Sequence, residues 1–195
     1  MKRMLILAGL SGTLIPALAS AELNYNAIDA GYSTTRYSNG NPNLTEIGIG
    51  FTRNYFERVY LGAYYGSAYQ ATYAAQGENR VHKISLGAGY HKPLMNNVDV
   101  VVAGHIVFGT ANWGGNSSSA NGYDVGAGVR ALFLHGIEGN LAVINASKSN
   151  GTYYSNSYTY IGAQFGFYFT QLLEMTAGID FKKDQTTSLG LRFYY

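Results

Sequence analysis

The chain has no cysteine, little proline and little charge, and each scarcity excludes a class of protein. Of its 195 residues, 3 are proline and 12% are charged, whereas ordinary soluble domains carry about 25% charged residues. The absence of cysteine excludes a disulfide scaffold, a Cys-ligated zinc site and a thiol nucleophile. Low charge together with 14% aromatic residues argues against intrinsic disorder. No apolar run approaches the roughly 18 residues of a transmembrane helix.

Glycine and tyrosine are abundant instead, with 25 and 18 copies, and apolar residues recur with a period of two. In Ile47-Gly48-Ile49-Gly50-Phe51 every second residue is apolar, and the stretch from Ile84 to Tyr90 repeats the pattern. Alternation of this kind indicates β-strands, and no window shows the spacing of an amphipathic helix. The sequence therefore predicts an all-β fold.

The first 21 residues have the composition of a secretory signal peptide. Two basic residues precede a short apolar run, and the segment ends on Ala19-Ser20-Ala21, a small-x-small cleavage pattern. We expect cleavage after Ala21, which leaves residues 22–195 as one domain. Removing Lys2 and Arg3 lowers Lys plus Arg from 13 to 11, equal to the 11 acidic residues, so the mature chain is formally neutral. It has no basic patch for nucleic acid.

The alternation continues through ten segments, which we predict to be strands. They are residues 23–36, 44–54, 57–68, 81–92, 97–109, 122–133, 136–147, 157–169, 173–182 and 186–195. Short connections near 54–57, 92–97, 133–136 and 169–173 alternate with longer ones at 37–43, 67–80, 110–121 and 147–157. Short turns at one end and long loops at the other are typical of an antiparallel up-and-down barrel in the outer membrane. The long loops would then face outside the cell.

The two faces of the predicted strands differ in chemistry. One is apolar and nearly free of charge, with aromatic residues at its ends, as a lipid-facing surface requires. The predicted lumen network on the other face comprises Glu46, Lys83, Asp99, Asp124, Arg130, Glu138, Glu174, Asp180 and Arg192. Because unpaired charges are costly in a narrow lumen, we expect Arg130 between Asp99 and Glu138, and Glu174 beside Arg192. Tyr60, Tyr64, Tyr160, Tyr168 and Tyr194 would fill further space. A plugged lumen is one interpretation; the many inward glycines favour the alternative, a narrow polar pore.

The C-terminal residues resemble a known assembly signal. Ser188, Gly190, Phe193 and Tyr195 match, position by position, the C-terminal pattern of outer-membrane β-barrels. Together with the leader, loop asymmetry and chain size, this resembles the small OmpA/OmpX-like barrels of Gram-negative bacteria. The resemblance implies recognition by the barrel-assembly machinery and a location among outer-membrane lipid and lipopolysaccharide. The best-known members have eight strands, which is the alternative to our count of ten.

The sequence contains no convincing catalytic motif. His82 with an acidic partner such as Asp124, Asp180 or Asp184 is the only faint hydrolase candidate, and a solvated rim explains these residues equally well. The Gly-x-Gly pairs lack the following helix that phosphate binding needs, and no cofactor is expected. We therefore expect a non-catalytic structural or surface-interaction protein, with a small-solute channel as the alternative. Loop aromatics that could contact a glycan or protein outside the cell are Tyr69, Tyr73, Trp113, Tyr153 and Tyr154.

Overall fold

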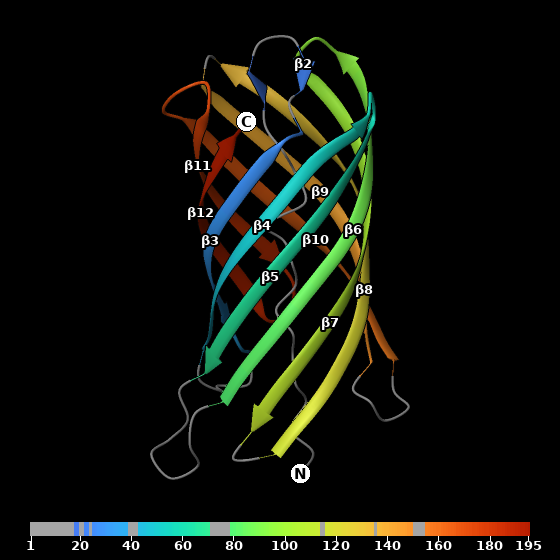
Figure 1. Ribbon diagram of the computed structural model, residues 1–195, viewed down its shortest axis with the longest axis vertical. Helices are drawn as coiled ribbons and strands as arrows, with labels where there is room; N and C mark the ends of the chain where they lie inside the picture. The colour runs from blue at the N-terminus through green and yellow to red at the C-terminus, as the bar shows by residue number, and fades with distance from the viewer. Residues whose placement is uncertain are drawn as a thin grey trace.

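The chain forms a closed antiparallel β-barrel. The computed structural model describes residues 18–19, 22–23, 25–38, 43–70, 79–113, 116–134, 136–149 and 155–195. Ten strands pair in chain order, and β12 returns to pair with β3, so the ring has no free edge (Figure 1). They are β3 (Ala27–Arg36), β4 (Leu44–Phe56), β5 (Val59–Gln70), β6 (Asn79–Met95), β7 (Val98–Trp113), β8 (Asn116–Leu134), β9 (Ile137–Ser149), β10 (Ser155–Tyr168), β11 (Leu173–Phe181) and β12 (Gln185–Tyr194). Two-residue strands β1 (Leu18–Ala19) and β2 (Glu22–Leu23) pair only with each other.

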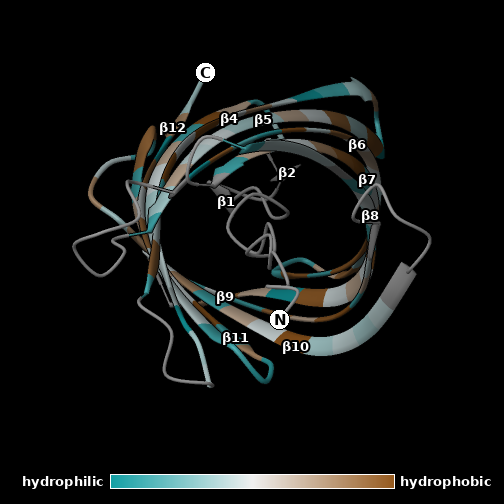
Figure 2. Cartoon of the chain, turned by 90° about the horizontal axis from the view of Figure 1, so that it is seen from below, coloured by the Kyte–Doolittle hydropathy of each residue, from teal (hydrophilic) through white to brown (hydrophobic). Residues whose placement is uncertain are grey.

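The barrel confirms the predicted fold class and the count of ten strands; the eight-stranded alternative is wrong. The view along the barrel shows hydrophobic and hydrophilic residues alternating along the strands of the ring (Figure 2). Apolar side chains such as Ile47, Leu141 and Phe165 point outward and are exposed, while polar side chains of opposite parity are buried inside. No helix in the described residues is long and apolar enough to span a membrane.

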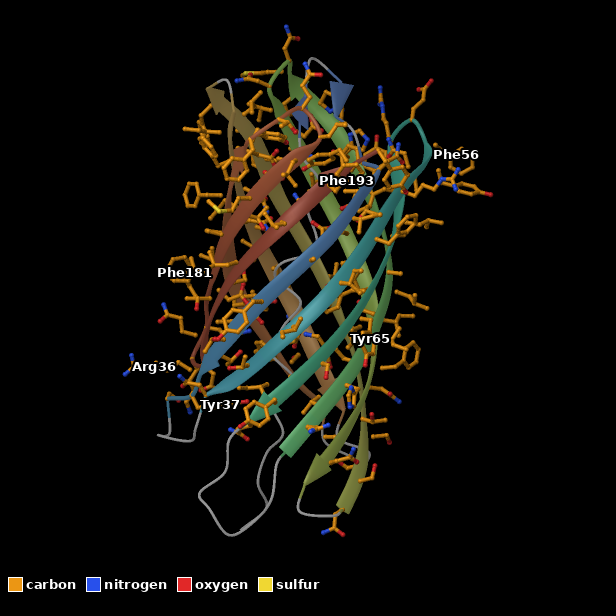
Figure 3. The ribbon with its side chains drawn as sticks, turned by 60° about the vertical axis from the view of Figure 1, so that its left-hand side comes forward. Arg36, Tyr37, Phe56, Tyr65, Phe181 and Phe193 are labelled. Atoms are coloured by element: carbon orange, nitrogen blue, oxygen red, sulfur yellow. The ribbon has the colours of Figure 1, made fainter. Side chains whose placement is uncertain are left out.

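The two ends of the barrel differ, although the β7–β8 connection at the long-loop end is shorter than expected. The tight turns lie at one end, which we call the short-turn end, where β4–β5, β6–β7, β8–β9 and β10–β11 are joined. Phe56 and Phe193 lie toward this end, whereas Tyr65 and Phe181 lie toward the opposite, long-loop end (Figure 3). Aromatic side chains also associate on the outer surface, since the ring of Tyr195 stacks on Phe51 at 5.9 Å, centroid to centroid. The apolar outer band is therefore bordered by aromatic residues at both ends.

Three strands are longer than the sequence predicts by three residues or more. β6, β7 and β8 contain 17, 16 and 19 residues, against 9 or 10 in β3, β11 and β12. The predicted loop at 110–121 is wrong, because Thr110 pairs with Ser119 and Asn112 with Ser117 in a continuous ladder. Strand residues also occupy the ends of the predicted loops at 67–80 and 147–157, whose central parts lie outside the described residues. Backbone pairing needs no apolar side chains, so these strands continue past the apolar band, where the alternation signal stops.

Candidate functional site: the polar lumen

The inward face of the barrel carries the charged residues singled out above. All nine members of the predicted lumen network are buried. Neighbouring strands bring them into register: Asp99 lies opposite Arg130, and Glu174 lies opposite Arg192. Their contacts fall into two groups, one at the short-turn end and one in the half of the lumen toward the long loops.

Arg130 on β8 anchors the first group. Its Nε and Nη2 atoms donate to Oε1 and Oε2 of Glu138 on β9, at 2.5 and 2.7 Å. Tyr168 on β10 donates its hydroxyl to the same carboxylate at 3.0 Å. A paired geometry of this kind is the arrangement in which a guanidinium compensates a buried carboxylate best. The contact joins three consecutive strands.

Arg192 on β12 continues the group around the ring. Its Nε donates to Asp29 Oδ1 on β3 at 2.5 Å, and its Nη1 lies 3.4 Å from Glu174 Oε2 on β11. The Tyr194 hydroxyl donates to the same Glu174 oxygen at 2.7 Å. The Tyr168 and Tyr194 rings stack at 6.0 Å, which connects this set to the Arg130 set.

Tyr25 crosses the lumen at this level. It lies just before β3, where the sequence predicted a strand from residue 23, and its hydroxyl donates to Asp99 Oδ2 on β7 at 3.0 Å. Its ring stacks on His91 of β6 at 3.9 Å and on Tyr60 of β5 at 5.0 Å. Cζ of Arg130 lies 5.8 Å from the ring centre. Because β3 and β8 are five strands apart in either direction around the ring, this contact spans the barrel.

These side chains form what we call the closing layer: Tyr25, Asp29, Tyr60, His91, Asp99, Arg130, Glu138, Tyr168, Glu174, Arg192 and Tyr194. Glu174 pairs with Arg192, but Asp99 differs from expectation: it contacts Tyr25 and His91, while the ion pair of Arg130 goes to Glu138. The predicted strand 23–36 includes Tyr25 on its inward parity, but a period of two does not show which distant strand an inward side chain will reach. Burial raises the pKa of Tyr25, so its hydroxyl stays protonated and can donate.

The second group lines the wall of the long-loop half. Lys83 Nζ lies 2.7 Å from Glu46 Oε1, which also accepts the Tyr64 hydroxyl at 2.6 Å. His105 Nδ1 lies 2.7 Å from Asp124 Oδ1 on the neighbouring strand. Lys182, just after β11, pairs with Asp180 at 3.1 Å; burial lowers its pKa, and the Asp180 carboxylate opposes that shift. The Glu46 and His105 contacts join adjacent strands or strands next but one, the Lys182–Asp180 pair stays at the end of β11, and none of them spans the barrel.

Inward glycines are covered by these lumen side chains. A Cβ atom on Gly48 would lie 1.9 Å from the Tyr64 hydroxyl oxygen, and one on Gly89 would lie 2.1 Å from Cζ of Tyr60. Gly87 is covered in the same way by His105, and Gly166 by Glu174. The abundance of inward glycine, which favoured a pore in the sequence, thus has a second explanation: it makes room for large polar side chains lying against the wall.

His82, the candidate catalytic residue, faces away from the lumen. Its Nδ1 lies 3.1 Å from the hydroxyl of Tyr65, an outward residue, whereas Asp124 and Asp180 are buried inside. Asp184 accepts hydrogen bonds from Ser38 instead. The pairing of His82 with these carboxylates is therefore wrong. Parity alone would have identified the histidine that does meet Asp124, namely His105. No group of three or more His, Asp or Glu side chains in the described residues could hold a metal ion.

The remaining predicted residues are those of the assembly signal, the cleavage site and the loop aromatics. Ser188 and Gly190 are on the inward side of β12, and Phe193 and Tyr195 are exposed outside. The Tyr195 amide donates to the Asn26 carbonyl at 3.2 Å. Tyr69 is exposed near the end of β5, Trp113 is the last residue of β7 and Ala19 ends β1. Ala21, Tyr73, Tyr153 and Tyr154 lie outside the described residues.

Solved structures share this fold at low sequence identity. The β domain of the Bordetella autotransporter BrkA matches with a TM-score of 0.59 and 12% identity, covering 88% of this chain and 100% of that one. An outer-membrane channel from Pseudomonas putida F1 gives 0.53 and 14%, covering 93% and 100%. The KdgM porin gives 0.52 and 7%, covering 87% and 99%. No protein-family model and no curated protein matches the chain. The fold is that of Gram-negative outer-membrane β-barrels.

Proposed function

We propose that this chain is an integral outer-membrane protein whose barrel is closed at the short-turn end and whose role is structural or surface-interacting, not catalytic. Residues 1–21 would be removed on export, and residues 22–195 would form the membrane domain. The apolar outer band and its aromatic borders support insertion in lipid. Closure of the ring leaves no unpaired edge, which the hydrocarbon interior demands.

The main observation in support of a closed lumen is the position of Tyr25. A wall-lining residue would leave the centre of the barrel open, but Tyr25 contacts Asp99 and Arg130 on the far side. Moving Tyr25 aside would break its hydrogen bond and expose the buried Asp99 carboxylate to a less compensated environment. The closing layer would therefore resist the passage of solutes.

The partners in this proposal follow from the barrel's surfaces. The outer band would contact phospholipid and lipopolysaccharide, and Ser188, Gly190, Phe193 and Tyr195 would serve recognition by the barrel-assembly machinery. The long-loop end, with Tyr69 exposed, would meet any glycan or protein ligand outside the cell.

Two measurements test the proposal. Unboiled and boiled samples of the outer-membrane fraction should migrate differently on a gel, because a barrel resists unfolding in detergent; equal migration of a soluble protein would contradict the membrane location. In planar bilayers the reconstituted protein should give no stable openings, with the KdgM porin as a positive control. Stable conductance steps would overturn the closed lumen.

A narrow channel is the second candidate, and the charge of the lumen favours it. The inward-facing described residues include seven carboxylates, Asp29, Glu46, Asp99, Asp124, Glu138, Glu174 and Asp180, against Lys83, Arg130, Lys182 and Arg192. The formal charge of these groups is −3 when the inward histidines, His91 and His105, are counted as neutral. A conducting lumen of this charge would prefer cations, so cation-selective steps would support the channel.

A further inference from the structure

The outer surface of the short-turn end carries its charge in one sector. Arg53 on β4, Glu57 and Arg58 in the β4–β5 turn, and Lys92 on β6 are all exposed. The other described turns at this end, residues 96–97 and 169–172, contain no charged side chain. None of the three cations takes part in an ion pair within the described part of the chain. The sector therefore has a net charge of +2, and its cations form no ion pair with the residues that the structure describes.

Backbone pairing brings Arg58 beside the residue that precedes Lys92, and Arg53 lies on the adjoining strand β4. The amide of His91 donates to the carbonyl of Arg58 at 3.0 Å, which joins the β4–β5 turn to the residue preceding Lys92. Val59 and Tyr90 form the last β5–β6 pair at this end, so Lys92 lies two residues beyond that ladder, level with the β4–β5 turn. Arg53 approaches from β4, whose partner in β5 at that point is Leu61.

Large apolar side chains surround the same cations. Tyr55 and Phe56 are 67% and 66% exposed, and Leu94 and Met95 are 58% and 68% exposed. Both pairs sit at irregularities of the strand register, between Asn54 and Phe56 and between Pro93 and Met95. A bulge breaks the alternation, so two consecutive residues can face outward. Figure 3 shows Phe56 projecting away from the barrel.

We call this surface the basic interfacial patch: Arg53, Tyr55, Phe56, Glu57, Arg58, Lys92, Leu94 and Met95. We propose that it binds the headgroup phosphate of an anionic phospholipid in the inner leaflet, an inference that rests on the membrane insertion proposed above. Guanidinium and ammonium groups are the side chains that recognise phosphate, and aromatic rings beside them occupy the headgroup boundary. Basic residues at this depth attract anionic lipid, whereas zwitterionic lipid offers no net charge to match.

The test places a fluorescent reporter in the patch. In a Phe56→Trp/Trp113→Phe background, the single tryptophan reports the lipid around the patch, because the native Trp113 ends β7 at the opposite end of the barrel. The protein is folded into phosphatidylethanolamine vesicles that contain phosphatidylglycerol, with one lipid brominated at a time. We expect brominated phosphatidylglycerol to quench more than its mole fraction predicts, and 1 M salt to reduce the excess.

Two triple variants decide the outcome. Arg53→Gln/Arg58→Gln/Lys92→Gln should lower the preference for phosphatidylglycerol by about fivefold or more, since each basic residue contributes to anionic-lipid attraction. Arg36→Gln/Arg80→Gln/Lys183→Gln, which removes exposed cations at the long-loop end, should leave it unchanged. Equal quenching by both brominated lipids in the parent, or an unchanged preference in the first variant, would overturn the patch. Gel heat-modifiability checks insertion separately, so failure of the membrane proposal is recognised on its own.

Discussion

The two halves of the lumen use similar side chains in different ways. At the short-turn end, Tyr25 reaches from one side of the barrel to Asp99 and Arg130 on the other. In the long-loop half, Tyr64 lies against the wall over Gly48, and Glu46 and Lys83 pair across a single intervening strand. A tyrosine bound to a carboxylate can therefore either close a barrel or line it. In this barrel the tyrosine that crosses the lumen, Tyr25, comes from the segment before β3, whereas Tyr64, within β5, lies against the wall.

The largest expected effect is the loss of closure when Tyr25 is removed. Tyr25→Ala deletes the cross-lumen ring and its hydrogen bond to Asp99, so we expect planar bilayers to show channel openings that the parent protein lacks. Tyr64→Ala is the matched control, since it removes a tyrosine–carboxylate bond of the wall without a cross-lumen contact. Channel openings in Tyr64→Ala and none in Tyr25→Ala would reverse our assignment of the two halves.

Removing Arg130 should give the largest loss of stability. Arg130→Ala leaves Glu138 buried without its guanidinium partner, and breaking one side of a buried ion pair costs about 3–5 kcal/mol. Urea titration of the protein in vesicles, followed by Trp113 fluorescence or gel mobility, measures the free energy of unfolding. Arg130→Lys should recover part of the loss, because it restores charge but not the two-point contact. A loss below about 1 kcal/mol for Arg130→Ala would mean that the closing layer is not an energetically linked unit.

Glycine substitutions test whether the closing layer is packed more tightly than the side chains that line the wall. Gly89→Ala places a Cβ against the Tyr60 ring, which is held by stacking on Tyr25, so we expect a cost of about 1–3 kcal/mol. Gly48→Ala meets the far end of Tyr64, which can swing into the lumen, and should cost less. Gly62→Ala is the control, because its Cβ would have no neighbour nearer than 3.8 Å. The same urea titration ranks the three; equal losses at Gly89 and Gly48 would contradict the difference in packing.

The smallest effect is expected where β12 closes onto β3. The hydroxyls of Thr35 and Thr186 form a buried hydrogen bond of 2.9 Å. Thr35→Val leaves the Thr186 hydroxyl unsatisfied and should lower the free energy of unfolding by about 1 kcal/mol. Replacing both threonines with valine should recover most of that loss, which a double-mutant cycle would show. Additive losses in the double variant would mean that the hydroxyls do not act as a pair.

Most of the fold follows from the sequence, because strand formation in a barrel obeys a local rule. A period of two assigns each residue to one face, and the short and long connections mark the two ends. Parity alone therefore places Glu46, Lys83, Asp124, Arg130 and Arg192 inside. The rule fails where its signal stops: beyond the apolar band, β7 and β8 continue through Ser, Thr and Asn, and the alternation no longer separates strand from loop.

The tertiary structure alone decided which lumen residues meet. Parity shows which face of the sheet a residue occupies, and its position in the strand shows how far along the barrel it lies. Its contact partner depends on strand register, on the glycines that make room for its side chain and on the curvature that brings distant strands together. The bond between Glu174 and Arg192 joins adjacent strands and could be anticipated. The contact of Tyr25 with Arg130 joins opposite sides of a closed ring. A local sequence pattern cannot show that two such distant residues meet. For this protein, the sequence determined the barrel and its two surfaces, and ring closure determined whether the lumen is crossed.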